Sequence, residues 1–147
     1  MKRLKANRSW ILVFLLTLVT LGIYSLYLIK VMARDTNIAC SKDGKKTSGL
    51  LKYILLSLFT LGIYSIVWDY SILSRWKTLA ENSGEQPKLS PNKYILLFLF
   101  GPLIVIGPFI IAVLKISGLN QMCFLYNETI PEEKIDPSKN NWGWKFN

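Results

Sequence analysis

The hexapeptide TLGIYS occurs twice in this chain, at Thr20–Ser25 and again at Thr60–Ser65. Each copy lies inside a long apolar segment, where a glycine is not needed for solubility or for an ordinary surface turn. The flanking residues repeat too, because LLTLVTLGIYS at 15–25 matches LLSLFTLGIYS at 55–65 in nine of eleven positions. The chain therefore repeats one apolar unit that is interrupted near its centre.

A third copy of the unit begins in the same way and then diverges. KYILLSLF at 52–59 matches KYILLFLF at 93–100 in seven of eight positions. The third copy continues as GPLIVIGP at 101–108, and its glycines and prolines also interrupt a helix. The residues expected to form the three breaks are Thr20, Gly22, Tyr24, Ser25, Thr60, Gly62, Tyr64, Ser65, Gly101, Pro102, Gly107 and Pro108.

Composition divides the 147 residues into seven segments. The apolar blocks exceed the ~18 residues that suggest a membrane segment, so we expect an integral membrane protein. The first block also resembles a secretory signal, but its recurrence downstream indicates that it is retained. The expected segments are a basic N-terminus (1–9), membrane repeats (10–40, 50–80 and 92–125), linkers (41–49 and 81–91) and a polar tail (126–147) with a Trp-rich end.

Each break is followed by a segment of different character. Residues 66–80 place Trp68 and Trp76 on one helical face and charged residues on the other, which is typical of a helix at the lipid–water boundary. We expect an all-α integral membrane protein of three repeated apolar units, each a helix broken near its middle and followed by an amphipathic interfacial helix. The expected interfacial anchors are Trp10, Trp68, Trp76, Trp142 and Trp144.

Two topologies are compatible with the breaks. Residues 10–21 reach about 18 Å as a helix, too short for a hydrocarbon core of ~30 Å, whereas residues 10–32 could span if the break is only a kink. If the three units span, eight Lys and Arg lie on each side of the membrane, without the usual bias. This equal distribution of Lys and Arg favours re-entrant hairpins, in which Gly22 and Gly62 adopt positive φ at a helix C′ position.

The doubled motif, followed by an aromatic-rich amphipathic stretch, resembles the bacterial domain of unknown function 4234. Members of that family carry tandem apolar units with a GIY centre, often with an LN pair after each. The nearest counterparts of that pair are Thr36–Asn37, Glu81–Asn82 and Leu119–Asn120, and the third unit lacks GIY. The resemblance covers residues 15–120 and implies a polytopic or re-entrant membrane protein, without an activity.

The net charge of +9, next to apolar segments, predicts contact with anionic lipid headgroups and leaves no soluble basic face for nucleic acid. The chain has no histidine and no nucleophile–base pair, so we expect no enzyme and no catalytic, cofactor-binding or metal-binding residues. Asp69 is the only acid within an apolar block. It is a possible intramembrane acid, although an interfacial helix would place it in water.

These patterns favour a non-enzymatic small membrane protein that self-associates and acts as a scaffold or accessory subunit of a membrane complex. The alternative is a small oligomeric pore or membrane-perturbing effector, with the Thr and Ser hydroxyls facing a lumen. The expected location is the bacterial inner membrane, multi-pass or re-entrant, with a cytoplasmic N-terminus. Cys40 and Cys123 indicate no disulfide framework.

Overall fold

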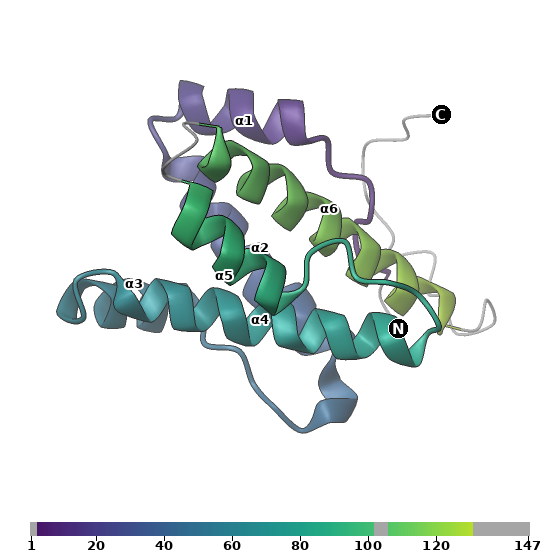
Figure 1. The fold of residues 1–147 in the computed structure, drawn as a ribbon. Coiled ribbons are helices and arrows are strands. Elements are labelled where there is room, and N and C mark those ends of the chain that lie inside the picture. The colour runs from purple at the N-terminus through teal and green to yellow at the C-terminus, as the bar shows by residue number, and fades with distance from the viewer. Residues whose placement is uncertain (1–2, 102–105, 131–147) are drawn as a thin grey trace.

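A computed structural model describes residues 3–101 and 106–130, and this part of the chain is all-helical, with no strand (Figure 1). Six α-helices follow one another, with one short 3-10 turn between the second and the third. The elements are α1 (Trp10–Val19), α2 (Ile23–Ala39), η1 (Ser41–Asp43), α3 (Leu50–Phe59), α4 (Ile63–Asn82), α5 (Pro91–Phe100) and α6 (Gly107–Glu128).

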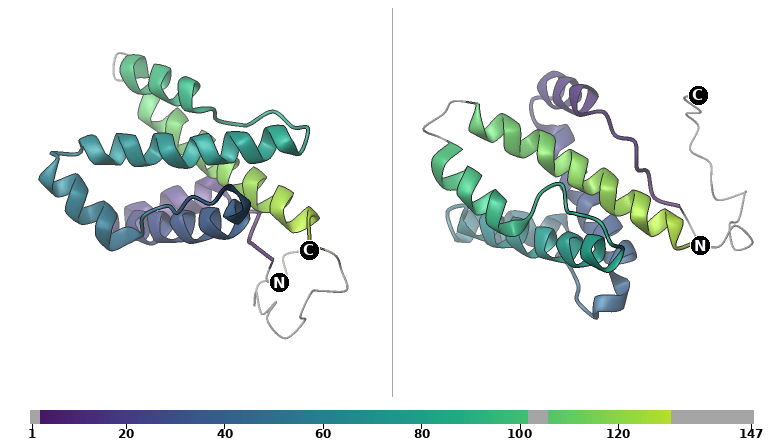
Figure 2. Two further views of the ribbon diagram at one scale, coloured as in Figure 1. Left: turned by 90° about the horizontal axis from the view of Figure 1, so that it is seen from below. Right: turned by 45° about the vertical axis from the view of Figure 1, so that its right-hand side comes forward.

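The helices pair into three hairpins, which we number in chain order: α1 with α2, α3 with α4, and α5 with α6. Each first arm has 10 residues, whereas the second arms have 17, 20 and 22. In Figure 2 the two arms of a hairpin diverge from their turn as a V. The repeated sequence unit is therefore a helical hairpin with one short and one long arm.

The core lies where the three long arms pack against one another, away from the turns. Trp76 of α4 is central to this packing. Its ring lies against Gly118 of α6, where a Cβ would be 3.2 Å from it, and its indole N–H donates to Thr36 Oγ1 of α2 at 2.8 Å. One tryptophan thus contacts both other long arms.

Trp68 and Trp76 are each 3% exposed, so the prediction that they anchor an interfacial helix is wrong. Trp68 also donates its indole N–H to the Ser48 carbonyl at 3.0 Å. The apolar face of an amphipathic helix has the same sequence pattern whether it packs against lipid or against protein. In this chain the partner is protein, and α4 runs without interruption from Ile63 to Asn82.

Among the described helices, only α6 is both long enough and apolar enough to cross a membrane, and about a third of its most apolar window is buried inside the protein. The first arms α1 and α3 are apolar but only 10 residues long. By length and composition, α6 is thus the one candidate for a membrane-spanning helix in the described part of the chain.

Candidate functional site

The first hairpin turn is a helix C-terminus in which two consecutive residues have positive φ. Leu21 has φ +51° and Gly22 has φ +91°. The Gly22 N–H donates to Thr17 O at 2.8 Å and the Leu21 N–H to Leu18 O at 3.2 Å, which together form a Schellman motif. Glycine therefore takes positive φ as expected, but at C″, because Leu21 occupies the C′ position.

The Thr and Ser of the motif satisfy backbone groups freed by the turn. Thr20 Oγ1 donates to Leu16 O at 2.7 Å and accepts from the Tyr24 N–H at 3.0 Å, so one hydroxyl bonds to the end of α1 and the start of α2. Ser25 Oγ donates to Gly22 O at 2.5 Å. These bonds give both hydroxyls of the motif a role in closing the turn.

The second copy has the same geometry. Leu61 has φ +51° and Gly62 has φ +88°, and the Gly62 N–H donates to Ser57 O at 2.7 Å. Thr60 Oγ1 again accepts the N–H of Tyr64, at 2.9 Å. The bonds that reverse the chain thus lie within the motif and the last turns of the helix before it.

The third hairpin closes differently. A Cβ built on Gly107 would lie 2.2 Å from the Gly101 Cα, so the two backbones touch and Gly107 has no room for a side chain, whereas a Cβ on Gly101 would lie 3.1 Å from the Gly107 Cα. Pro108 lies in the first turn of α6, where its missing N–H costs nothing. Pro102, also expected in this break, lies outside the described residues.

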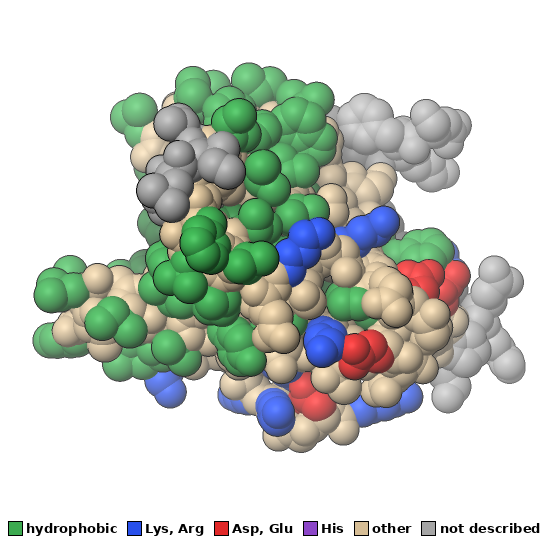
Figure 3. All heavy atoms as spheres, in the orientation of Figure 1, with side chains coloured by type: hydrophobic (Ala, Val, Ile, Leu, Met, Phe, Trp, Pro, Cys, Tyr) green, Lys and Arg blue, Asp and Glu red, His purple; other side chains and the backbone are tan. Residues whose placement is uncertain are grey.

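Exposed apolar side chains cover the hairpin arms near all three turns, and we call this surface the apolar belt. Leu21 and Leu61 are 95% and 94% exposed. Figure 3 shows hydrophobic side chains gathered toward the turn ends and charged side chains on the opposite part of the molecule. The belt comprises the exposed apolar residues of 10–27, 51–70, 96–100 and 106–110, and the sequence has no charged residue in 9–29, 53–68 or 94–114.

The opposite end, which we call the polar base, consists of segment 3–9, both linkers and the ends of the long arms. Side-chain amides order it. Asn120 of α6 accepts the Arg8 N–H at 3.0 Å and donates to Arg8 O at 2.8 Å. Asn127 makes the same pair of bonds with Leu4, both at 2.7 Å. The extended N-terminal segment is thereby fixed along α6.

The linkers are held in the same way. Asn37 of α2 accepts the Thr47 N–H at 2.6 Å and donates to Thr47 O at 2.9 Å. In the second linker, Gln121 of α6 accepts the Lys88 N–H at 2.9 Å and donates to Gln86 O at 2.8 Å. Every described segment that joins two hairpins is therefore bonded to a long arm.

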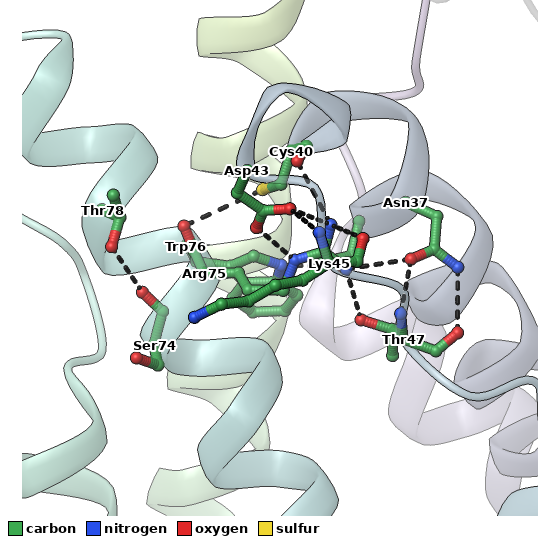
Figure 4. A network of polar contacts seen from close by, with 10 residues as sticks. Asn37, Cys40, Asp43, Lys45, Thr47, Ser74, Arg75, Trp76 and Thr78 are labelled. Carbon is green, nitrogen blue, oxygen red and sulfur yellow. Dashed lines mark hydrogen bonds and ion pairs between the residues drawn. The ribbon is translucent and has the colours of Figure 1, made fainter.

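Arg75 of α4 is the largest polar hub of the base (Figure 4). Its side chain is 3% exposed and pairs with Asp43 of η1 at 2.6 Å, which fastens the first linker to hairpin 2. The guanidinium also donates to Asn37 Oδ1 (2.9 Å), Thr47 Oγ1 (2.6 Å), Cys40 O (3.2 Å) and Lys45 O (3.0 Å).

Two groups next to Arg75, the Asp43 carboxyl and the Cys40 thiol, have shifted pKa values. Partial burial raises the pKa of the Asp43 carboxyl, but the hydrogen bonds from Arg75 and from the Lys45 N–H outweigh it, and the net pKa is lowered. Burial raises the pKa of the Cys40 thiol to about 11, with a smaller opposing effect of Arg75. Cys40 is therefore an unreactive thiol at neutral pH.

Two further acids are buried and paired. Asp35 of α2 is 0% exposed and binds Arg8 at 2.8 Å and Arg34 at 2.9 Å. Asp69 of α4 binds Lys115 Nζ of α6 at 2.6 Å and accepts the Tyr94 hydroxyl of α5 at 2.9 Å. Asp69 is 8% exposed, so it is surrounded by helices α5 and α6 and not by water as an interfacial helix would imply.

The remaining expected site residues have ordinary surroundings. Trp10 is 41% exposed in the apolar belt and packs edge-on against Phe109, with ring centroids 5.6 Å apart. The Tyr64 hydroxyl donates to Ser48 Oγ at 3.0 Å, and Tyr24 contacts Tyr27. Trp142 and Trp144 lie outside the described residues.

Sequence reasoning missed the buried ions of the polar base. Arg75 was expected on a solvated helix face, and neither Asp35 nor Asn127 stood out. The available signal was the pair resembling LN, since Asn37 and Asn120 are two of the four side-chain amides that bond to linker or N-terminal backbone, together with Gln121 and Asn127. The described residues hold no cluster of three or more His, Cys, Asp or Glu that could bind a metal.

Comparison with protein families gives two overlapping matches to one family model, described as Domain of unknown function (DUF4234). They cover residues 8–75 and 48–119, one match for hairpins 1 and 2 and one for hairpins 2 and 3, as expected for a repeat. The resemblance inferred from the TLGIYS motifs is therefore confirmed. Searches of curated proteins and of solved structures found no match.

Proposed function

The chain belongs to the DUF4234 family, and from this premise we propose that it is a non-enzymatic membrane scaffold whose three hairpins enter the bilayer from one side. The observation that carries the proposal is the separation of the apolar belt from the polar base. Exposed apolar patches on soluble monomers rarely exceed a few hundred Å², and a patch around three hairpin ends needs a partner. Hydrocarbon is the partner that fits a surface without charge.

Arm length supports entry to about mid-membrane. A 10-residue helix is about 15 Å long, or half of a ~30 Å hydrocarbon core. The turns at Thr20–Gly22 and Thr60–Gly62 satisfy their own backbone groups with Schellman bonds and Thr hydroxyls, as irregular backbone in hydrocarbon requires. The chain then returns to the side from which it entered.

The length of α6 would allow it to span, but its contacts favour the same one-sided arrangement. Its second half carries Asn120 and Asn127, which bond to the backbone of Arg8 and Leu4. That half also holds the second linker through Gln121. A helix end bonded to the N-terminal segment and to a linker lies at the polar base, beside the starts of hairpins 1 and 3.

Three exposed lysines fit the headgroup region of anionic lipids. Lys30, Lys52 and Lys93 lie one in each hairpin, and each is the residue next to a charge-free stretch. Lysine at such a boundary extends its ammonium toward phosphate while its methylenes stay in the apolar layer. We propose that the base faces the cytoplasm of a bacterial cell, because cytoplasmic segments are enriched in Lys and Arg.

Most of the hydroxyls that a pore would need donate to backbone carbonyls instead, and the exception is Ser57 Oγ, which is buried without a hydrogen-bond partner. Thr17 donates to Val13 O at 2.8 Å, and Thr20 and Ser25 donate to carbonyls of the first turn. This use of the hydroxyls supports a scaffold over a channel. We further propose that copies of the chain associate with one another or with a membrane complex, through the polar base that the two linkers and the Arg75 hub keep ordered.

The scaffold proposal is tested by reconstituting the purified chain at low protein-to-lipid ratio. Single-molecule photobleaching should count more than one copy per particle, or a copy bound to a co-purified membrane protein. Vesicles loaded with a potassium-sensitive dye should remain tight. One copy per particle, without a bound partner, in native membranes and in vesicles would contradict the scaffold proposal. Rapid ion flux would favour the pore alternative.

A further inference from the structure

An apolar cleft of about 320 Å³ lies between hairpins 1 and 3, where α1 and α2 face α6. It extends from Pro108, near the turn of hairpin 3, to Met32 and Leu119 in the core. Its volume is at the lower end of the range for ligand sites, ~300–1,000 Å³. Most of the side chains around it are aliphatic or aromatic.

The few polar side chains in the cleft already have partners. Thr17 Oγ1 donates to Val13 O at 2.8 Å, and Ser25 Oγ donates to Gly22 O at 2.5 Å. Lys115 Nζ is bound to Asp69 at 2.6 Å. Both hydroxyl hydrogens are therefore engaged within the chain and the Lys115 ammonium is paired with a carboxylate, so the cleft offers a ligand a mainly apolar lining.

The cleft opens onto the apolar belt through three aromatic rings. Phe109 packs edge-on against both Trp10 and Phe14, with ring centroids 5.6 and 5.8 Å apart. All three rings are between 39% and 49% exposed. Under the one-sided membrane arrangement, the mouth of the cleft faces the hydrocarbon of the bilayer and not water.

We propose that this cleft binds one acyl chain of a membrane lipid, which fills the seam between hairpin 1 and hairpin 3. An empty cleft of this size would forfeit the dispersion contacts of its lining atoms, and hydrocarbon lies at its mouth to supply them. The lipid would stabilise the packing of α1 against α6. The inference rests on the proposed membrane insertion and adds a ligand of defined chemistry to it.

The test is the number of lipid molecules that stay with the chain on purification from membranes in mild detergent, measured by native mass spectrometry. The filling variant is Ala112→Phe, because Ala112 of α6 lines the cleft. The matched control is Ile110→Phe, which adds a ring two residues away on the same helix, at a 39% exposed position that does not line it. We expect about one lipid per wild-type and Ile110→Phe chain and at least fivefold less on Ala112→Phe.

A third variant keeps the inference testable if Ala112→Phe folds poorly. Thr17→Val preserves shape and removes a hydroxyl, so an acyl chain should be retained as in the wild type, whereas a polar ligand held by Thr17 would be lost. Two results would overturn the acyl-chain proposal but not the membrane scaffold. One is an equal number of bound lipids on the wild type and on a folded Ala112→Phe variant. The other is no bound lipid on a wild-type chain recovered from the membrane fraction. A wild-type chain absent from the membrane fraction overturns both.

Discussion

Asn120 binds Arg8 through both backbone groups of that residue, accepting its N–H at 3.0 Å and donating to its carbonyl at 2.8 Å across 112 positions of sequence. This contact joins the segment that precedes α1 to helix α6. It also places the N-terminal segment and the second half of α6 at the same end of the structure.

Replacing Asn120 with alanine should release the N-terminal segment. The change leaves a partly buried N–H and C=O of Arg8 without partners, and such losses cost about 1–3 kcal/mol. Thermal unfolding in detergent should show the lower stability, and limited proteolysis should cut before Trp10. Asn82→Ala, at an exposed position in the second unit, is the control and should change neither readout. Equal stability of the two variants would contradict the role of Asn120 in holding the N-terminal segment.

Valine at Gly62 should destabilise the second hairpin far more than valine at Gly49. Gly62 has φ +88°, a conformation that costs other residues about 1–2 kcal/mol and a β-branched residue more, whereas Gly49 has φ −73°. Neither position has a neighbour within 4 Å of an added Cβ, so crowding does not distinguish them. Melting temperatures of the two variants in the same detergent give the comparison, and equal losses would refute the turn geometry.

A lysine at the hairpin turn should block insertion. Leu61 is 94% exposed and lies at the turn of hairpin 2, so Leu61→Lys would place a charge near mid-membrane at a cost of about 2.5–3.5 kcal/mol. Phe124→Lys is the matched control, because Phe124 is 49% exposed at the polar base. Carbonate extraction of membranes should release Leu61→Lys and retain Phe124→Lys. Full retention of Leu61→Lys would contradict burial of the turn in lipid.

Removing the Arg75 hub should loosen the first linker. Arg75→Met leaves Asp43 without its ion pair and the carbonyls of Cys40 and Lys45 without this donor, a loss of about 1–3 kcal/mol because Asp43 is partly exposed. Proteolysis between Ser41 and Gly49 should become faster. The control is Lys77→Ala, which removes an exposed pair with Glu81 and should have little effect.

The same pair predicts an acid dependence of stability. The pKa of Asp43 is lower in the folded chain than its ordinary value of 3.8, so the stabilisation by Arg75 is present above pH 3.8 and is lost as the pH falls through the lowered folded value. Asp43→Asn should flatten this part of the acid unfolding curve. An unchanged curve would show that Arg75 does not hold the carboxylate in solution.

The helix breaks could be predicted because their cause is local. Thr20, Gly22 and Ser25 bond to backbone groups no more than five positions away, so the local sequence contains the whole interaction. The third break was marked by glycine and proline, but the contact of Gly101 with Gly107 depends on how α5 and α6 approach each other. Composition alone indicates a break there and does not indicate its geometry.

The polar base could not be predicted, because its bonds connect distant segments. Arg75 binds Asp43 across 32 positions, and Asp69 binds Lys115 across 46. A charged residue on an amphipathic helix has the same local pattern whether it faces water or a linker folded over it. For the same reason, the aromatic face with Trp68 and Trp76 predicted a lipid interface where the structure has a protein core.

The sides on which the two linkers lie test the one-sided insertion most directly. Lys46 and Ser83 are exposed linker positions, so each is replaced separately by cysteine, and a membrane-impermeant thiol reagent is applied to intact bacterial cells and to inside-out vesicles. The wild-type chain is the control, since Cys40 and Cys123 are both buried. One-sided hairpins predict labelling of Lys46→Cys and Ser83→Cys in inside-out vesicles and of neither in intact cells. Labelling of one variant in intact cells and of the other only in inside-out vesicles would show that hairpin 2 spans the membrane, and would contradict the central claim.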